Sequence, residues 1–381
     1  MRNKIQAIFS STPEIRRAVT MALLWLVVVN GFGLIALNRL NLAPDKAFSW
    51  MTKDLIKPPP QNWDIINLHN RWDSYWYLDI AKNGYYLRGE KDIANIVFFP
   101  LYPLLMRMLA PLAGGNLVVS GWIVSSLFLV LATGMLVRLT QTHHPDIDPL
   151  LPVVFLLAYP TAFILNAVYS ESLFLFLSLA VVYYARQQRF LLASVFAAFA
   201  SATRIAGLFL CVLLLVEILQ AYGFRSLFSR RVLPLALAPS GAVAFFSYHW
   251  IAFGDFFLYL KVEFNWGRDF EMAASDFVAR NNAYLVNMAN DLFFLAMGIV
   301  IGIVALRRLR ISYGVYMLVS MGIALSSGTT LAVARYSMML FPIYLFAASI
   351  GSITGRSAWL LSSVLLLALN IISFANHYWI G

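Results

Sequence analysis

Three observations predict an all-α protein that crosses a membrane many times. Of its 381 residues, 61% are hydrophobic, 15% aromatic and only 12% charged, whereas a soluble domain carries about 25% charged residues. The hydrophobic residues gather in charge-free runs near or above the ~20 residues that a spanning helix needs. Basic residues gather in short stretches between these runs, as in membrane proteins with positive cytoplasmic loops. The runs are 18–38, 108–137, 149–170, 232–254, 311–334, 336–355 and 357–381.

The expected spans follow in order from the N-terminus. The first, at about 18–39, comes after a basic stretch that the positive-inside rule places in the cytoplasm. Counting all the apolar stretches, we expect about eleven membrane helices. The others are expected at about 116–138, 150–168, 171–186, 189–204, 205–221, 232–254, 284–306, 311–328, 336–353 and 357–378. This organisation excludes a cytosolic enzyme and a nucleic-acid partner, and the single cysteine excludes a disulfide scaffold.

The charges in the connecting segments predict the side on which each segment lies. Residues 41–96 carry seven basic and seven acidic residues, and 255–283 carry three basic and five acidic ones. Without a basic excess, both are expected outside. The segments 222–231 and 307–310 contain arginines and no acid, so both are expected in the cytoplasm.

Residues 97–113 are short for a span and contain Pro100, Pro103 and Pro111. We interpret them as a broken or re-entrant helix on the outer side, because irregular backbone is tolerated where protein or water covers it. In the alternative, 97–113 is a true span and 190–221 is one helix. Both versions contain eleven spans, so the count does not distinguish them.

A geometric argument favours the first version. The charge-free segments 172–185 and 190–203 surround a polar turn, so an antiparallel hairpin brings Glu171 and Arg204 to the same height. Each arm is only ~21 Å long at 1.5 Å per residue, against a hydrocarbon core of ~30 Å. The two charges are therefore expected inside the membrane slab, where ionisable groups are functional or pair with each other.

The densest polar and aromatic cluster lies in the first external segment, at residues 69–79. Tryptophan and tyrosine alone would suit an interfacial belt. Asp73, however, is flanked by Arg71 and Trp72. Apolar neighbours make a carboxylate a better proton acceptor, which suits a general base, whereas a nearby arginine opposes this. Asp79 lies six residues on and is expected to be solvated.

Three blocks of residues resemble the PIG-V-like family, the second mannosyltransferases of glycosylphosphatidylinositol assembly and their prokaryotic relatives. The first block is Arg71-Trp72-Asp73, Ile80-Ala81, Gly84-Tyr85, Phe98-Phe99-Pro100 and Pro103. The second is Pro160, Ala162-Phe163, Ala167 to Phe174, Arg186, Ala202-Thr203-Arg204 and Gly207. The third is Ala334-Arg335-Tyr336 with Phe341-Pro342, which resembles GT-C transferases more widely.

The resemblance implies a GT-C fold with a catalytic first external loop that carries juxtamembrane helices. It implies a transmembrane module over 1–221, including the loop 41–96, followed by C-terminal membrane helices over 222–381 with the loop 255–283. The chain has no Asn-X-Ser/Thr glycosylation site, which favours a prokaryotic plasma membrane, with the active site external and the N-terminus cytoplasmic.

By the same resemblance, the donor is a sugar on a polyprenyl phosphate and transfer inverts the anomeric centre. Asp73 would be the general base, and Glu171 would orient Arg204 or bind sugar hydroxyls. Arg204 and Arg335 would hold the phosphate, since guanidinium binds phosphate bidentately. The other residues expected at the donor are Tyr336, Arg71, Trp72 and Tyr102. The scheme requires no metal or cofactor, because arginine can hold a monophosphate.

The acceptor is left open as a lipid, a glycan or a protein, and mannose is the family's default sugar. Two other classes remain alternatives: a lipid or solute transporter or flippase, and a non-catalytic scaffold of the same fold. Transporters usually show repeated halves. No internal repeat is visible here, and the polar cluster at 69–79 lies outside the expected spans.

Overall fold

The computed structural model describes residues 12–40, 63–88, 94–265, 285–326, 332–378 and 380. Within these ranges all regular structure is helical. Among the described residues, five helices are long and apolar enough to cross a membrane, which makes the chain a multi-pass membrane protein. They are α2 (Pro13–Arg39), α7 (Leu117–His143), η4 with α11 (Ile205–Leu208 and Phe209–Tyr222), α15 (Leu285–Arg308) and α19 (Ile353–Ala375). The pair η6 (Arg230–Leu237) and α12 (Ser240–Phe253), bent by 46°, gives a sixth.

Two of the expected spans are broken by proline-containing segments, so the expectation of continuous helices there is wrong. The stretch 150–168 forms α8 (Leu151–Leu157) and η3 (Ala162–Asn166), with Pro160 between them. The stretch 336–353 forms the end of α17 (Val333–Met338) and α18 (Pro342–Ser349). Proline lacks an N–H and clashes with the preceding turn, which ends a helix. Both breaks are buried inside the protein.

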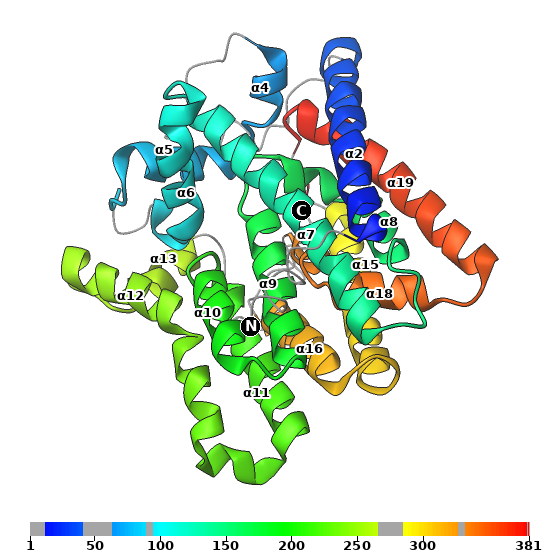
Figure 1. The fold of residues 1–381 in the computed structure, drawn as a ribbon. Helices are drawn as coiled ribbons and strands as arrows, with labels where there is room; N and C mark the ends of the chain where they lie inside the picture. The colour runs from blue at the N-terminus through cyan, green and yellow to red at the C-terminus, as the bar shows by residue number, and fades with distance from the viewer. Residues whose placement is uncertain are drawn as a thin grey trace.

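The expected hairpin is confirmed by α9 (Glu171–Arg186) and α10 (Phe190–Ser201), which pack against each other. The chain leaves helical geometry at Arg204, whose backbone is extended with φ −157° and ψ 151°. The alternative of one helix over 190–221 is therefore wrong. Helices α7, α10 and α11 surround α9, which lies in the middle of the molecule (Figure 1).

Residues 63–113, which include the described part of the expected first external segment, contain short helices. These are α4 (Asp64–Leu68), α5 (Ser74–Asn83), η1 (Asn95–Val97), α6 (Leu101–Leu109) and η2 (Ala110–Ala113). Helix α5 packs against η1 and α6, while α4 packs against α2. Within the stretch 97–113, α6 and η2 form one short apolar helix over Leu101–Ala113, below the length of the candidate spans. Arg107 of α6 donates to the carbonyl oxygens of Ala81, at 2.7 Å, and Ile80, at 3.2 Å, and so holds α6 against the end of α5. Parts of the expected external loops, 41–62, 89–93 and 266–283, lie outside the described residues.

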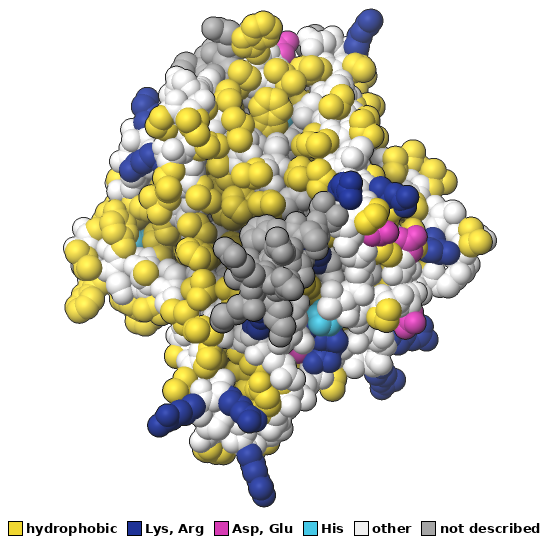
Figure 2. All heavy atoms as spheres, viewed as in Figure 1, with side chains coloured by type: hydrophobic (Ala, Val, Ile, Leu, Met, Phe, Trp, Pro, Cys, Tyr) yellow, Lys and Arg dark blue, Asp and Glu magenta, His cyan; other side chains and the backbone are white. Residues whose placement is uncertain are grey.

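The two segments expected in the cytoplasm lie at one end of the molecule. Glu217, near the end of α11, pairs with Arg310, which precedes α16 (Ile311–Ser326). Arginine side chains extend from the segment after α11 at the lower end of Figure 2. Their position at the same end of the molecule agrees with the arginine distribution, which predicts that both segments lie on the same side of the membrane.

Candidate active site

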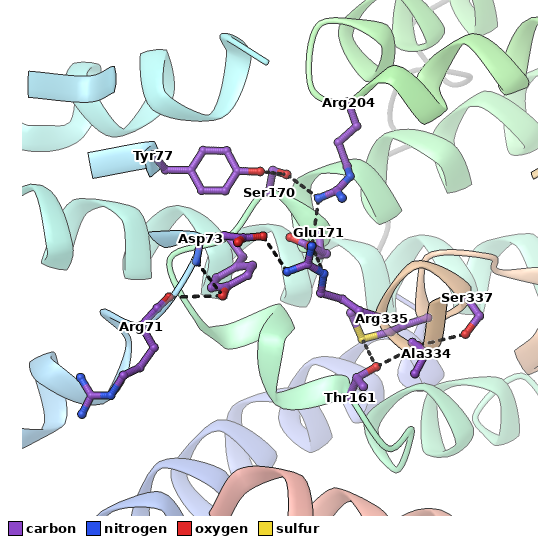
Figure 3. Close-up of polar contacts among 12 residues, drawn as sticks. Arg71, Asp73, Tyr77, Thr161, Ser170, Glu171, Arg204, Ala334, Arg335 and Ser337 are labelled. Atoms are coloured by element: carbon purple, nitrogen blue, oxygen red, sulfur yellow. Dashed lines mark hydrogen bonds and ion pairs between the residues drawn. The ribbon is translucent and has the colours of Figure 1, made fainter. Parts of the chain in front are cut away.

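Four charged side chains that are far apart in the sequence form one chain of ion pairs (Figure 3). Arg335 Nη1 lies 2.7 Å from Asp73 Oδ2, and Arg335 Nε lies 3.5 Å from Glu171 Oε1. Arg204 Nη1 lies 2.9 Å from the same Glu171 oxygen. The four side chains are between 0% and 15% exposed, so the charges balance one another largely away from solvent.

Asp73 is positioned by backbone contacts at the start of α5. Its N–H donates to the Tyr169 hydroxyl at 3.1 Å, and that hydroxyl donates to the carbonyl of Arg71 at 3.2 Å. The preceding residue, Trp72, has φ 52°, a left-handed conformation that is strained in residues other than glycine, by about 1–3 kcal/mol. Trp72 Nε1 donates to the carbonyl of Tyr378 at 3.1 Å. These contacts hold the backbone in the conformation that turns Asp73 toward Arg335.

Glu171 and Arg204 meet as the hairpin predicts, from the first residue of α9 and the break after α10. Arg204 Nη1 also donates to Ser170 Oγ at 3.0 Å, and Ser170 is 2.8 Å from the Tyr77 hydroxyl. Neither oxygen of Glu171 has an aligned hydrogen bond to any described residue, although two guanidinium groups are close. A buried, charged acceptor in this condition is rare in proteins, which makes Glu171 a candidate acceptor for the hydrogen-bond donors of a ligand.

Arg335 is carried by the short helix α17, which is fixed from two sides. The Thr161 hydroxyl donates to the carbonyl of Ala334 at 3.3 Å, and Ser337 is 2.7 Å from the Tyr159 hydroxyl. The ring of Tyr336 lies 5.3 Å from the guanidinium carbon of Arg335 and 5.4 Å from that of Arg204. The ring of Tyr336 therefore lies beside both arginines that the sequence interpretation expects at the phosphate.

Arg71 is not where that interpretation expects it. Its side chain points away from Asp73 (Figure 3) and donates to the carbonyl oxygens of Asn67 and, at 3.0 Å, Asn70. Burial lowers the pKa of this guanidinium to about 10. The arginine that pairs with Asp73 is Arg335, which is 262 positions away in the sequence.

Trp72 and Tyr102 lie beside the ion pairs without joining them. The Tyr102 hydroxyl bonds to Gly121 O at 3.0 Å and to Ser125 at 2.7 Å, while its ring packs 5.0 Å from that of Tyr77. Trp72 is 2% exposed, with its indole N–H turned to the C-terminal segment. Both support the residues that line the ion-pair chain.

The expectation that Asp79 is solvated is wrong. Its side chain is buried and accepts hydrogen bonds from Asn83, at 2.7 Å, and Asn95, at 3.0 Å. The segment after α5 folds back and covers it. Asp79 is thus a satisfied structural carboxylate six residues from the candidate base.

Four residues near the site were not singled out from the sequence: Tyr77, Tyr169, Ser170 and Asp291. Tyr169 and Ser170 lie within the second block of the family resemblance, and Tyr77 within the aromatic cluster. Asp291 is an acidic residue inside an expected span, a position where ionisable groups are functional by default. The sequence therefore marks each of the four residues, but the spacing between them does not predict that they lie near one another.

The arrangement joins a carboxylate that can accept a proton to two guanidinium groups that can bind a phosphate. The ligand type most readily accommodated is a phosphorylated sugar, with hydroxyls for Glu171 and a phosphate for the arginines. Among the residues that the structure describes, no three His, Cys, Asp or Glu side chains gather in a group that could hold a metal ion.

The match to a known family agrees with this chemistry. A family model described as "Mannosyltransferase (PIG-V)" matches residues 34–260, a range that includes Asp73, Glu171 and Arg204 and ends before Arg335. Among solved structures, the chain is similar to ArnT from Cupriavidus metallidurans bound to undecaprenyl phosphate. That likeness has a TM-score of 0.48 at 12% identity and covers 93% of this chain and 76% of that chain. No curated protein sequence matches the chain.

Proposed function

The chain belongs to the PIG-V mannosyltransferase family, a group of GT-C glycosyltransferases, and from that premise we propose that it transfers mannose from a polyprenyl phosphate to a hydroxyl group. The acceptor is a lipid, a glycan or a protein. The observation that carries the proposal is the buried ion-pair chain of Asp73, Arg335, Glu171 and Arg204. It combines in one place a base, two phosphate ligands and a carboxylate with unused hydrogen-bonding capacity.

In the proposed reaction, the acceptor oxygen attacks the anomeric carbon while Asp73 takes the proton from that hydroxyl. The bond between the anomeric carbon and the phosphate oxygen breaks, and the polyprenyl phosphate leaves with the electron pair. Arg335 and Arg204 stabilise the charge that develops on this phosphate. Attack opposite the leaving group inverts the anomeric centre, so a β-linked donor gives an α-linked product.

The geometry supports a binding order with the donor first. Without a ligand, Arg335 holds one oxygen of Asp73 at 2.7 Å. A donor phosphate competes for the same N–H groups, since charge-assisted bonds from guanidinium to phosphate are strong. Once Arg335 turns to the phosphate, Asp73 becomes free to accept the proton of the acceptor hydroxyl. Glu171 then accepts from sugar hydroxyls while remaining beside Arg204.

The proposal places the site on the external side of a prokaryotic plasma membrane, with a cytoplasmic N-terminus. In this topology the short and broken helices join the long ones to give about eleven crossings of GT-C type, in modules 1–221 and 222–381. Helices α6 and η2 expose the apolar side chains of Leu104, Met108 and Leu112, and α6 packs beside α5. That surface suits contact with membrane lipids and with the prenyl chain of the donor.

A transporter or flippase is the second candidate, because the broken helices α8–η3 and α17–α18 lie inside the protein close to buried charges. Transporters often bind substrates at interrupted helices of this kind. This candidate predicts movement of a lipid or solute without formation of a glycosidic bond.

The test uses purified protein in lipid nanodiscs, with synthetic polyprenyl-phosphate mannose and a membrane-extract acceptor pool. We expect transfer by the wild type and a loss of at least ~1,000-fold in Asp73→Asn, since removing a general base costs about 10²–10⁴. The matched control is Asp79→Asn, which changes a buried carboxylate on the same helix that accepts hydrogen bonds from Asn83 and Asn95. We expect it to transfer within about threefold of wild type.

Equal transfer by Asp73→Asn and wild type would remove Asp73 from the mechanism. Lipid movement by the wild type without a glycosylated product, for any polyprenyl-phosphate sugar, would favour the transporter.

A further inference from the structure

Asp291 is a third buried carboxylate near the ion-pair chain, and the proposed reaction gives it no role. It lies in α15, is 2% exposed, and its Oδ1 accepts from the backbone N–H of Ala334 at 3.3 Å. The N–H of Ala332 also hydrogen-bonds to this carboxylate, and the charge of Arg335 acts on it. Helix α15 packs against α17, so the hydrogen bond joins two elements that are distant in the sequence.

Helix α17 lacks a cap of its own. It has six residues and begins after Ala332, which has φ 68° and ψ 15° and whose methyl side chain cannot accept a hydrogen bond. The first N–H groups of any helix have no partner within the helix. Buried N–H groups without a partner are costly, and replacing a capping side chain by alanine destabilises the helix that it caps. Asp291 satisfies this need from a neighbouring helix.

The position of this cap determines where Arg335 points. Arg335 immediately follows Ala334, whose N–H is held by Asp291 and whose carbonyl is held by Thr161. The first turn of α17 is therefore clamped on both sides. Without the carboxylate of Asp291, α17 can tilt or fray at the end that carries Arg335, and a shift of about 1 Å in such a group can cost 10²-fold in rate.

We propose that Asp291 is a positioning residue that caps α17 and thereby holds Arg335 in place for the phosphate of the donor. The proposal rests on the transfer reaction above for its kinetic part, and on the hydrogen bond alone for its structural part. Its essential feature is an oxygen acceptor at this position. A negative charge is not required, because asparagine keeps an oxygen that can accept from the Ala334 N–H.

The kinetic test compares Asp291→Ala with Asp291→Asn, using polyprenyl-phosphate mannose as the varied substrate. We expect Asp291→Ala to raise the donor KM about tenfold, the equivalent of one missing cap, with a smaller change in kcat. Asp291→Asn is expected within about threefold of wild type. In the double variant with Arg335→Ala, the Asp291→Ala substitution should cost nothing further, since both act through Arg335.

The matched control is Glu217→Ala, which removes another buried carboxylate, bound to Arg310 and Ser312 at the cytoplasmic end. We expect it to lower thermal stability and leave the donor KM of the folded protein unchanged. If Glu217→Ala raises the donor KM as much as Asp291→Ala does, general destabilisation explains the effect of Asp291→Ala. This result would overturn the proposal.

Hydrogen–deuterium exchange of the segment 332–339 tests the structural part without any sugar transfer. We expect faster exchange in Asp291→Ala and wild-type exchange in Asp291→Asn. If the wild type transfers no sugar, the proposed function fails while this measurement still decides the role of Asp291. Unchanged exchange in Asp291→Ala, or equal damage by the two variants, would overturn the cap. If Asp291→Ala does not fold, Asp291→Ser, with its shorter side chain, replaces it in both measurements.

Discussion

Two buried carboxylate–arginine clusters lie at opposite ends of α11, and their hydrogen bonding differs sharply. At the end that carries Arg310, both oxygens of Glu217 accept from that arginine, at 2.6 and 2.8 Å, and Ser312 adds a third bond. At the other end, Glu171 lies near two guanidinium groups without one aligned hydrogen bond to a described residue. A carboxylate that is fully satisfied stabilises a fold. One that is held by charge alone retains capacity for a ligand.

The largest difference is expected between the two arginines. Arg335→Ala should reduce transfer by at least ~1,000-fold, because it removes a ligand for the phosphate charge in the transition state. Arg310→Ala should leave the transfer by folded protein near wild type and lower its stability by about 3–5 kcal/mol, because it leaves Glu217 buried and unpaired. Radiolabelled mannose transfer and thermal unfolding in detergent measure the two effects. Comparable losses of transfer in both variants would contradict the distinction.

The two glutamates sharpen the same comparison. Glu171→Gln should reduce transfer about 100-fold, since it removes the carboxylate that lies beside both Arg204 and Arg335. It should also lower stability, because the buried ion-pair chain then carries an unbalanced positive charge. Glu217→Gln should lower stability as well, because an amide replaces one acceptor oxygen in a bidentate pair, but it should leave transfer by the folded protein near wild type. Unfolding temperatures and initial rates, measured on the same preparations, give the comparison. A loss of transfer in Glu217→Gln equal to that in Glu171→Gln would contradict the difference between the two clusters.

A smaller effect is expected at Tyr336, whose ring lies beside both Arg335 and Arg204. Cation–π contacts contribute about 0.5–2 kcal/mol. Tyr336→Phe keeps the ring and should transfer within about threefold of wild type, whereas Tyr336→Ala should lose about tenfold. The measurement is the donor kcat/KM. Equal losses of kcat/KM in the two variants would show that the hydroxyl of Tyr336, and not its ring, contributes to the reaction.

The smallest effect concerns acid stability near the site. His69 stacks on Trp122 with ring centroids 4.3 Å apart, and burial together with the charge of Arg71 lowers its pKa from 6.5 to about 3. The unfolded chain therefore binds a proton that the folded chain does not, so stability falls as the pH drops from about 6.5 toward 3. His69→Gln should reduce the dependence of the unfolding temperature on pH over this range, measured in thermal unfolding scans. An unchanged slope would assign the acid sensitivity to other groups.

The hairpin containing Glu171 and Arg204 shows that the lengths of neighbouring segments can predict a contact between two side chains. Two charge-free arms around a polar turn put both residues at one height, and the structure places them 2.9 Å apart. The same kind of reasoning failed for Arg71, which is two residues from Asp73 but turns toward Asn67 and Asn70. Neighbours in sequence share a backbone, but side-chain direction depends on what the rest of the fold offers as a partner.

The sequence by itself determined that the chain is helical and lies in a membrane, because composition and the lengths of apolar runs are local properties that bilayer thickness converts into helices. It also pointed to Asp73, Glu171 and Arg204, and by resemblance to Arg335. Only the tertiary structure decided that these four form one ion-pair chain, that Asp79 is buried, and that Asp291 caps the helix of Arg335. Those contacts join segments up to 262 positions apart in the sequence. Whether such segments meet depends on how the many helices pack together, and no local sequence pattern encodes that packing.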